Sequence, residues 1–137
     1  MTAPNQTPSD NPAEQRPNQH GDFIWYDLMT TDAAAAKKFY GALLGWTFQD
    51  SGQDGMAYHV ISAKDQSIGG LMPISAEMSA GGAQPCWMGY INVDDVDAAA
   101  KALKSAGGTV HRQAWDIPGA GRMAFVADPQ GAMFYIM

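Results

Sequence analysis

The second half of this sequence repeats the pattern of the first half at an offset of 63 residues, and this repeat constrains the fold more than any other feature. The shift superimposes related positions in order: Trp25 on Met88, Asp32 on Asp95, and Gly45 on Gly108. Each copy opens with an apolar run, at residues 23–29 and 86–93, followed by acidic residues and a series of alanines. A supersecondary unit of this size leaves one face uncovered on its own, so the two copies are expected to pack together in one domain.

Each copy has the pattern of one strand, one helix and three further strands. A helix is predicted after Asp32 and again after Asp95, because these side chains can cap a helix and apolar residues then recur three and four positions apart. We expect the apolar face of the first helix to be buried. Its members are Ala36, Phe39, Tyr40, Leu43 and Leu44. Short apolar runs after each helix predict the remaining strands, which are 46–49, 56–63, 67–74, 109–115, 122–127 and 132–137.

The sequence therefore predicts an α+β domain over residues 21–137, made of two βαβββ modules at about 21–75 and 84–137. Residues 1–20 hold four of the eight prolines among polar residues, and no large apolar residue follows the first methionine, so we expect a disordered tail there. The longest uncharged run, 78–93, contains Gly and Pro, which argues against a membrane span. The start of the chain lacks the pattern of a secretion signal, and we expect a cytoplasmic protein.

Charge and cysteine content exclude several classes of partner and site. The chain has 14 acidic and 8 basic residues, a net charge of −6. This balance repels phosphate backbones and anionic lipids, so neither nucleic acid nor a membrane is expected as a partner. The single cysteine, Cys86, excludes an intrachain disulfide and fits a reducing compartment.

Several motifs stand in an order that is typical of one superfamily. They are Asp32 with Phe39-Tyr40 and Leu44-Gly45-Trp46, Asp94 with Gly107-Gly108, and the run Phe125-Val126-Ala127-Asp128-Pro129-Gln130-Gly131. Together they resemble the vicinal oxygen chelate superfamily, which includes glyoxalase I, extradiol dioxygenases and bleomycin-resistance proteins. The segment 21–32 looks closer to a glyoxalase-like branch that is often found as tandem domains. The resemblance implies a curved, cup-shaped sheet with helices on its convex side, a concave active cavity, and pairing into homodimers.

The resemblance also locates the positions that hold a metal ion in other members. Four strand positions on the concave side carry His, Glu or Gln ligands in metal-dependent members, and the matching motifs place them at Trp25, Gly70, Met88 and Tyr135. An indole, a glycine, a thioether and a phenol are poor ligands for zinc, nickel or iron. We therefore predict no metal and no cofactor, which argues against glyoxalase and dioxygenase chemistry because both depend on the metal.

Side chains alternate between the two faces of a strand, so these positions indicate which residues face the concavity. The candidate ligand-binding residues are Trp25, Asp27, Gly70, Met88, Tyr90 and Tyr135, and Phe23 is expected to face the same way. Asp27 is expected to pair with Arg112 or Arg122, or with a cationic or donor group of the ligand.

Three functions remain open from the sequence. The first is metal-free binding of a small aromatic or cationic molecule in the concave cavity, which needs no catalytic group. The second is a lyase or isomerase of altered, metal-independent mechanism, with Asp27 or a histidine as base. The third is a non-catalytic interaction module whose cavity is filled by its own side chains or by the N-terminal tail.

Overall fold

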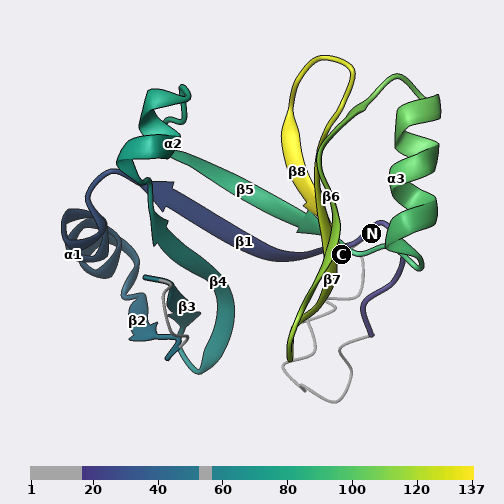
Figure 1. Ribbon diagram of the computed structural model, residues 1–137. Helices are drawn as coiled ribbons and strands as arrows, with labels where there is room; N and C mark the ends of the chain where they lie inside the picture. The colour runs from purple at the N-terminus through teal and green to yellow at the C-terminus, as the bar shows by residue number, and fades with distance from the viewer. Residues whose placement is uncertain (1–16, 53–56) are drawn as a thin grey trace, which may run out of the picture.

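The computed structural model describes residues 17–52 and 57–137, which form one eight-stranded mixed sheet with three helices (Figure 1). Residues 1–16, the larger part of the predicted tail, lie outside the described residues. The first module contains β1 (Phe23–Thr30), α1 (Ala33–Leu44), β2 (Thr47–Asp50), β3 (His59–Ala63) and β4 (Gln66–Pro73). After α2 (Ala76–Ala80), the second module contains β5 (Cys86–Ile91), α3 (Val96–Ser105), β6 (Thr109–Ile117), β7 (Gly121–Ala127) and β8 (Met133–Ile136).

The strand order is β2-β3-β4-β1-β5-β8-β7-β6, so the two modules lie side by side in one sheet. Their first strands, β1 and β5, are antiparallel neighbours at the centre, and each pairs on its other side with the last strand of its own module. The predicted α+β class and the two βαβββ modules are therefore confirmed. The short helix α2 between the modules was not predicted; Ser75 caps it by accepting a hydrogen bond from the backbone N of Met78 at 3.1 Å.

The two long helices begin where the repeated acidic residues predict. Asp32 accepts a hydrogen bond from the backbone N of Ala35, and Asp95 accepts one from the backbone N of Ala98, each at 3.0 Å. These bonds satisfy amide groups that a helix N-terminus leaves without a partner. Gly45 ends α1 in the left-handed conformation, with φ of 71°.

Each long helix packs on one end of the curved sheet, and Figure 1 shows α1 and α3 on its outer side, far apart from one another. Under α3, Val96 and Ala100 join a buried cluster of strand residues: Ala124, Val126 and Ile136. Under α1, a smaller cluster consists of Leu28, Ile61 and Leu71, with Ala33, Ala36 and Tyr40 packed against it. The inner face of the sheet carries neither helix.

The predicted burial of the apolar face of α1 is wrong for three of its five members. Phe39, Leu43 and Leu44 are 59%, 62% and 51% exposed, and α1 contains no fully buried residue. The stripe that reaches the sheet is narrow, because Ala33, Ala36 and Tyr40 already cover the available strands. Phe39 is displaced by about 100° around the helix from Tyr40, its neighbour in that stripe.

The described residues contain no helix that is both long enough and apolar enough to cross a lipid bilayer. His20, the last residue of the predicted tail, lies against the second module, where its Nδ1 accepts a hydrogen bond from the backbone N of Asp94 at 3.1 Å.

Candidate functional site on the concave face

The structure brings the six predicted site residues together on one face of the sheet. Strand pairing places Asp27 opposite both Met88 and Gly70, and places Tyr90 opposite Tyr135. Directly opposed residues point to the same side of a sheet. Leu28, the next residue after Asp27, packs under α1, so Asp27 and its opposed partners face the side without helices.

Asp27 is the centre of this group. Only 3% of its surface is exposed, and each carboxylate oxygen accepts a hydrogen bond from a tyrosine hydroxyl at 2.6 Å: Oδ1 from Tyr58 and Oδ2 from Tyr90. The indole N–H of Trp25 in turn donates to the Tyr58 oxygen at 2.8 Å. Distances this short are typical of bonds to an ionised acceptor. The carboxylate is therefore enclosed by protein donors and does not itself face a ligand.

The expectation that an arginine pairs with Asp27 is wrong. Arg122 is bound to Asp97 and Asp116 instead, and the guanidinium of Arg112 lies 3.7 Å from the centre of the Trp115 ring. Two neutral tyrosine hydroxyls supply the hydrogen bonds that the Asp27 carboxylate needs, so no positive charge has to be buried beside it.

Burial shifts the pKa values of Asp27 and of the tyrosines around it. Burial raises the pKa of Asp27 above its usual value, and the hydrogen bonds from Tyr58, Tyr90 and Trp25 offset this only in part. Burial, reinforced by the negative charge of Asp27, also raises the pKa values of Tyr58, Tyr90 and Tyr135. The phenols therefore stay protonated, and they act as donors to Asp27 and not as bases.

This shift has a testable consequence for stability. Because folding raises the pKa of Asp27, the folded state holds its proton more tightly than the unfolded state does, whose pKa is near 3.8. We expect the difference in unfolding free energy between wild type and Asp27→Asn to fall as the pH rises from about 3.8 through the raised pKa. Urea unfolding of both proteins across pH 3–8 measures this difference. The other carboxylates contribute equally to the unfolding free energy of both proteins, so their contributions cancel. A difference that rises over this window would contradict the assigned direction.

A row of aromatic rings crosses the concave face from β5 to β6. Tyr90 stacks on Tyr135 with ring centres 4.5 Å apart, Tyr135 lies 4.9 Å from Phe125, and Phe125 lies 5.4 Å from His111. Tyr135 and Phe125 are half-buried, so ring surface remains accessible. The row provides a flat apolar surface beside the hydrogen-bonded group at Asp27.

Three members of this site were not predicted: Tyr58, Phe125 and His111. Tyr58 lies just before β3, and its hydroxyl occupies the space that a side chain at Gly70 would fill. The adjacent Gly69 and Gly70 were the available signal, because consecutive glycines in a strand indicate a close approach. Phe125 could have been found from the alternation of β7.

The predicted inward orientation of Phe23 is wrong. The pairing of β1 with β5 shifts register between Phe23 and Trp25, which is an irregularity of the bulge type. Phe23 therefore stacks with Tyr26 at 6.0 Å and lies against Gly89, on the face opposite Trp25. An extra residue at the bulge places the residues before it on the opposite face from the one that simple alternation would predict.

The four residues that the family resemblance places at metal positions do not fit a metal ion. Trp25, Gly70, Met88 and Tyr135 supply no imidazole, carboxylate or thiolate. Both oxygens of the nearest carboxylate, that of Asp27, are already bound to tyrosine hydroxyls. Within residues 17–52 and 57–137, no three His, Cys, Asp or Glu side chains are arranged to hold a metal.

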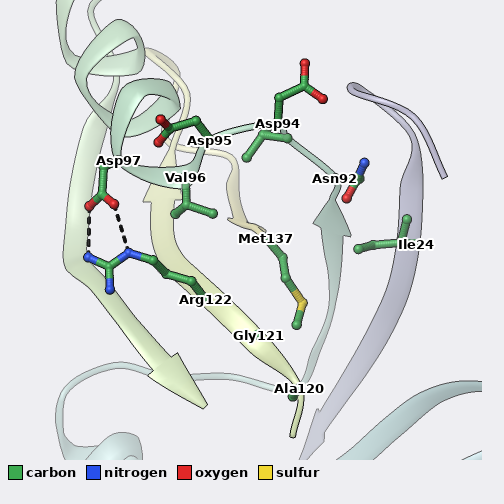
Figure 2. Close-up of a pocket in the computed structure, with 11 residues that line it drawn as sticks. Ile24, Asn92, Asp94, Asp95, Val96, Asp97, Ala120, Gly121, Arg122 and Met137 are labelled. Atoms are coloured by element: carbon green, nitrogen blue, oxygen red, sulfur yellow. Dashed lines mark hydrogen bonds and ion pairs between the residues drawn. The ribbon is translucent and has the colours of Figure 1, made fainter. Parts of the chain in front are cut away.

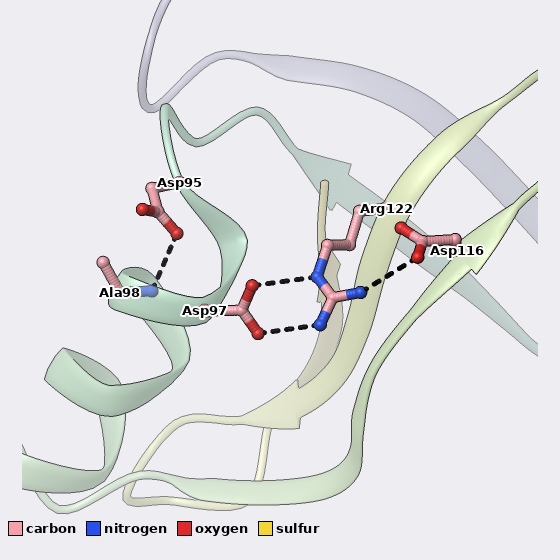
Figure 3. A network of polar contacts seen from close by, with 5 residues as sticks. All are labelled: Asp95, Asp97, Ala98, Asp116 and Arg122. Atoms are coloured by element: carbon pink, nitrogen blue, oxygen red, sulfur yellow. Dashed lines mark hydrogen bonds and ion pairs between the residues drawn. The ribbon is translucent and has the colours of Figure 1, made fainter.

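A separate hollow of about 520 Å³ lies at the N-terminal end of α3 (Figure 2). Arg122, which lines it, donates two hydrogen bonds to Asp97 at 2.9 Å and one to Asp116 at 3.2 Å (Figure 3). Asp95 is engaged as the helix cap. These contacts serve the fold, so the concave face is the stronger candidate for function.

Comparison with known proteins agrees with this architecture. The chain is 41% identical over 110 residues to "Putative glyoxylase CFP32" of Mycobacterium tuberculosis, and 34% identical over 125 residues to "Anthracycline biosynthesis protein DnrV" of Streptomyces peucetius. The matches cover 79% and 82% of this chain but only 42% and 45% of those proteins, so the chain spans less than half of their length.

Among solved structures, methylmalonyl-CoA epimerase from Mycobacterium tuberculosis has a TM-score of 0.58 at 19% identity, with 85% of each chain covered, which is a likeness of fold. The family model described as Glyoxalase/Bleomycin resistance protein/Dioxygenase superfamily matches residues 23–136. With its paired modules and single curved sheet, this chain belongs to the glyoxalase/bleomycin resistance protein/dioxygenase superfamily.

Proposed function

We propose that this protein binds a small, flat aromatic molecule on its concave face, without a metal ion, and that the molecule carries hydrogen-bond donors or a positive charge. The observation that supports this proposal most is the aromatic row of Tyr90, Tyr135 and Phe125 beside the enclosed Asp27. Flat apolar surface with a few oriented polar groups is typical of small-molecule sites.

The preference for donors follows from the orientation of the two hydroxyls. Tyr58 and Tyr90 both direct their hydrogens at Asp27; Tyr90 is buried, so the half-buried Tyr58 is the phenol whose oxygen can present a lone pair to a ligand. The Tyr58 oxygen already accepts a hydrogen bond from the indole N–H of Trp25, which supports a preference for N–H donors at this oxygen. The negative charge of Asp27 behind the phenols further favours an ammonium or a phenolic hydroxyl on the ligand.

Binding accounts for the site better than lyase or isomerase chemistry does. A general base must reach the proton that it abstracts. Both oxygens of Asp27 are occupied, and the raised pKa values of Tyr58 and Tyr90 oppose formation of a phenolate base. His111 lies against Phe125, and His59 Nε2 lies 3.2 Å from the ammonium group of Lys37; within residues 17–52 and 57–137 no hydrogen bond or ion pair joins either histidine to a carboxylate.

A relative offers a chemically suitable probe. The name of DnrV connects that protein with anthracycline biosynthesis. Anthracyclines combine fused planar rings, phenolic hydroxyls and an amino sugar, which are the features that the aromatic row and the tyrosine oxygens would recognise. Daunorubicin is therefore the first probe, and a planar hydrocarbon dye without donors is the matched comparison.

The expected result is that daunorubicin binds with one site per chain, measured by calorimetry and by quenching of tryptophan fluorescence. Tyr135→Ala should weaken binding about tenfold because it removes a stacking ring, whereas Tyr135→Phe keeps the ring and should bind nearly as wild type. Added EDTA should leave the affinity unchanged, and purified protein should contain no stoichiometric zinc, nickel or iron.

Two results would overturn the proposal. Loss of binding on EDTA treatment, or stoichiometric metal in the protein, would contradict the metal-free site. Absence of binding to daunorubicin and to the donor-free dye would favour the interaction module, with the concave face occupied by Tyr58 and its neighbours.

The proposal also includes a cytoplasmic location and no nucleic-acid or membrane partner. The net charge of −6 and the single cysteine support it. Expression of the protein with a terminal fluorescent tag, followed by cell fractionation, tests the location.

A further inference from the structure

The edge strand β6 has two irregularities that bring an arginine to the concave face. The pairing of β6 with β7 shifts register between Val110 and Arg112, and again between Arg112 and Trp115. Val110 packs against the buried cluster under α3. Arg112 follows two residues later, and it is opposed to Phe125 of the aromatic row. Simple alternation would place Val110 and Arg112 on one face, so the first irregularity moves Arg112 to the face without helices.

The second irregularity gives this arginine a support. Trp115 is opposed to Met123, which precedes Phe125 by two residues in β7 and therefore shares its face. The central carbon of the Arg112 guanidinium lies 3.7 Å from the centre of the Trp115 ring, so the cation stacks on the indole. Stacking occupies one face of the planar group and leaves the N–H groups at its edge free to donate.

The concave face therefore carries charges of opposite sign at its two ends. Asp27 lies on β1, enclosed by tyrosines, whereas Arg112 is exposed on β6. Tyr135 lies on β8 between these strands: burial and the charge of Asp27 raise its pKa, and the charge of Arg112 lowers it in part. Neighbouring strands lie about 4.8 Å apart, so the three steps from β5 to β6 cover about 14 Å. A molecule of three fused rings with a polar group at each end matches this length.

We infer that Arg112 binds a carboxylate of the ligand, so that the concave face is specific for a flat aromatic acid whose hydrogen-bond donors lie near Tyr58. This inference rests on the proposed function, because it assigns a further group to the same ligand. The guanidinium fork matches the two oxygens of a carboxylate, and charged pairs of this kind are stronger than neutral hydrogen bonds. A carboxylate can lie in the plane of the ring that carries it, whereas a tetrahedral phosphate cannot, so the flat row favours a carboxylate.

A purely structural role accounts for Arg112 less well. The other arginine of the second module, Arg122, shows that role: its N–H groups are bound to Asp97 and Asp116. In the part of the chain that the structure describes, no carboxylate forms a hydrogen bond or ion pair with Arg112. Bulges beside a site commonly turn a side chain toward it, and here the irregular segment of β6 borders the aromatic row.

Two anthraquinones that differ in one group test this inference. Rhein and aloe-emodin share a dihydroxyanthraquinone core, but rhein carries a carboxylate where aloe-emodin carries a neutral hydroxymethyl group. Quenching of tryptophan fluorescence of the full chain, near neutral pH, measures both affinities. Because Arg112 is exposed, rhein should bind more tightly by a modest factor, about fivefold. Added salt should reduce this preference by screening the charges.

Three variants assign the preference to the arginine. Arg112→Gln should remove it, so that rhein and aloe-emodin bind equally, and Arg112→Lys should keep part of it because the charge remains without the fork. Lys104→Gln is the matched control: it removes one positive charge from an exposed position of α3, on the outer side of the sheet, and should keep the full preference. Circular dichroism should show the same fold for all three.

The outcomes separate this inference from the proposed function. Equal binding of both compounds to the wild type would overturn the inference and leave the proposed function standing. A preference for rhein that Arg112→Gln retains, or that Lys104→Gln also removes, would do the same, because the charge at Arg112 would then not be its source. Absence of binding by either compound would count against the proposed function, and the inference would fail with it.

Discussion

Replacement of Asp27 by alanine should lower the free energy of unfolding by about 3 kcal/mol and abolish ligand binding. The variant leaves two hydroxyls without their acceptor, and Tyr90 is 6% exposed, so water cannot replace the lost bond there. An unsatisfied buried donor costs about 1–3 kcal/mol, and relief of the desolvation of the carboxylate offsets part of the sum. Urea denaturation with an unchanged m-value measures the loss.

Asp27→Asn separates the charge of the residue from its shape. The amide keeps one acceptor oxygen, so it should cost less stability, about 1 kcal/mol. Its NH₂ group would donate to one phenol and turn that hydroxyl outward, so binding of a donor-rich ligand should still fall. Asp116→Ala is the control, since this carboxylate is exposed and is bound to Arg122, not to a residue of the site. Unchanged stability of Asp27→Ala would show that the tyrosine hydroxyls find other partners.

Gly69→Ala is the second change with a large expected effect, a loss of about 3 kcal/mol or more of stability. A Cβ at this position would overlap the backbone carbonyl oxygen of Tyr26, at the point where β4 pairs with β1. Backbone atoms in a paired strand cannot move away without breaking the ladder. Thermal and urea unfolding should both show the loss.

The neighbouring substitution, Gly70→Ala, should affect the site more than the fold. Its Cβ would overlap the hydroxyl end of Tyr58, which is a side chain and can swing away. Tyr58 would then lose its bonds to Asp27 and Trp25, so ligand binding and the tryptophan emission should change while stability falls by about 1–2 kcal/mol. Wild-type binding by Gly70→Ala would show that Tyr58 has no part in the site.

The general fold could be predicted from the sequence because its signals are local and repeated. Asp32 and Asp95 cap helices through bonds to residues three positions ahead, and strand alternation depends only on neighbours. The same alternation placed Trp25, Asp27 and Tyr90 on one face.

The errors arise where a residue depends on distant parts of the chain. Phe23 changes sides because β1 shifts register against β5, a strand more than 60 residues away in sequence. Tyr58 meets Asp27 only through the pairing of β3 with β4 and of β4 with β1. The exposure of Phe39 depends on how much sheet lies under α1, which helical periodicity does not measure.

The bond between Tyr90 and Asp27 joins two positions that the repeat itself relates, since they are 63 residues apart. Two copies of the first module paired in the same way would bring two buried carboxylates together, and repulsion would oppose that arrangement. Two copies of the second module would place a phenol against a phenol with no charged acceptor between them. Because these equivalent positions hold an aspartate in one module and a tyrosine in the other, pairing of a first module with a second module is favoured over pairing of two identical modules.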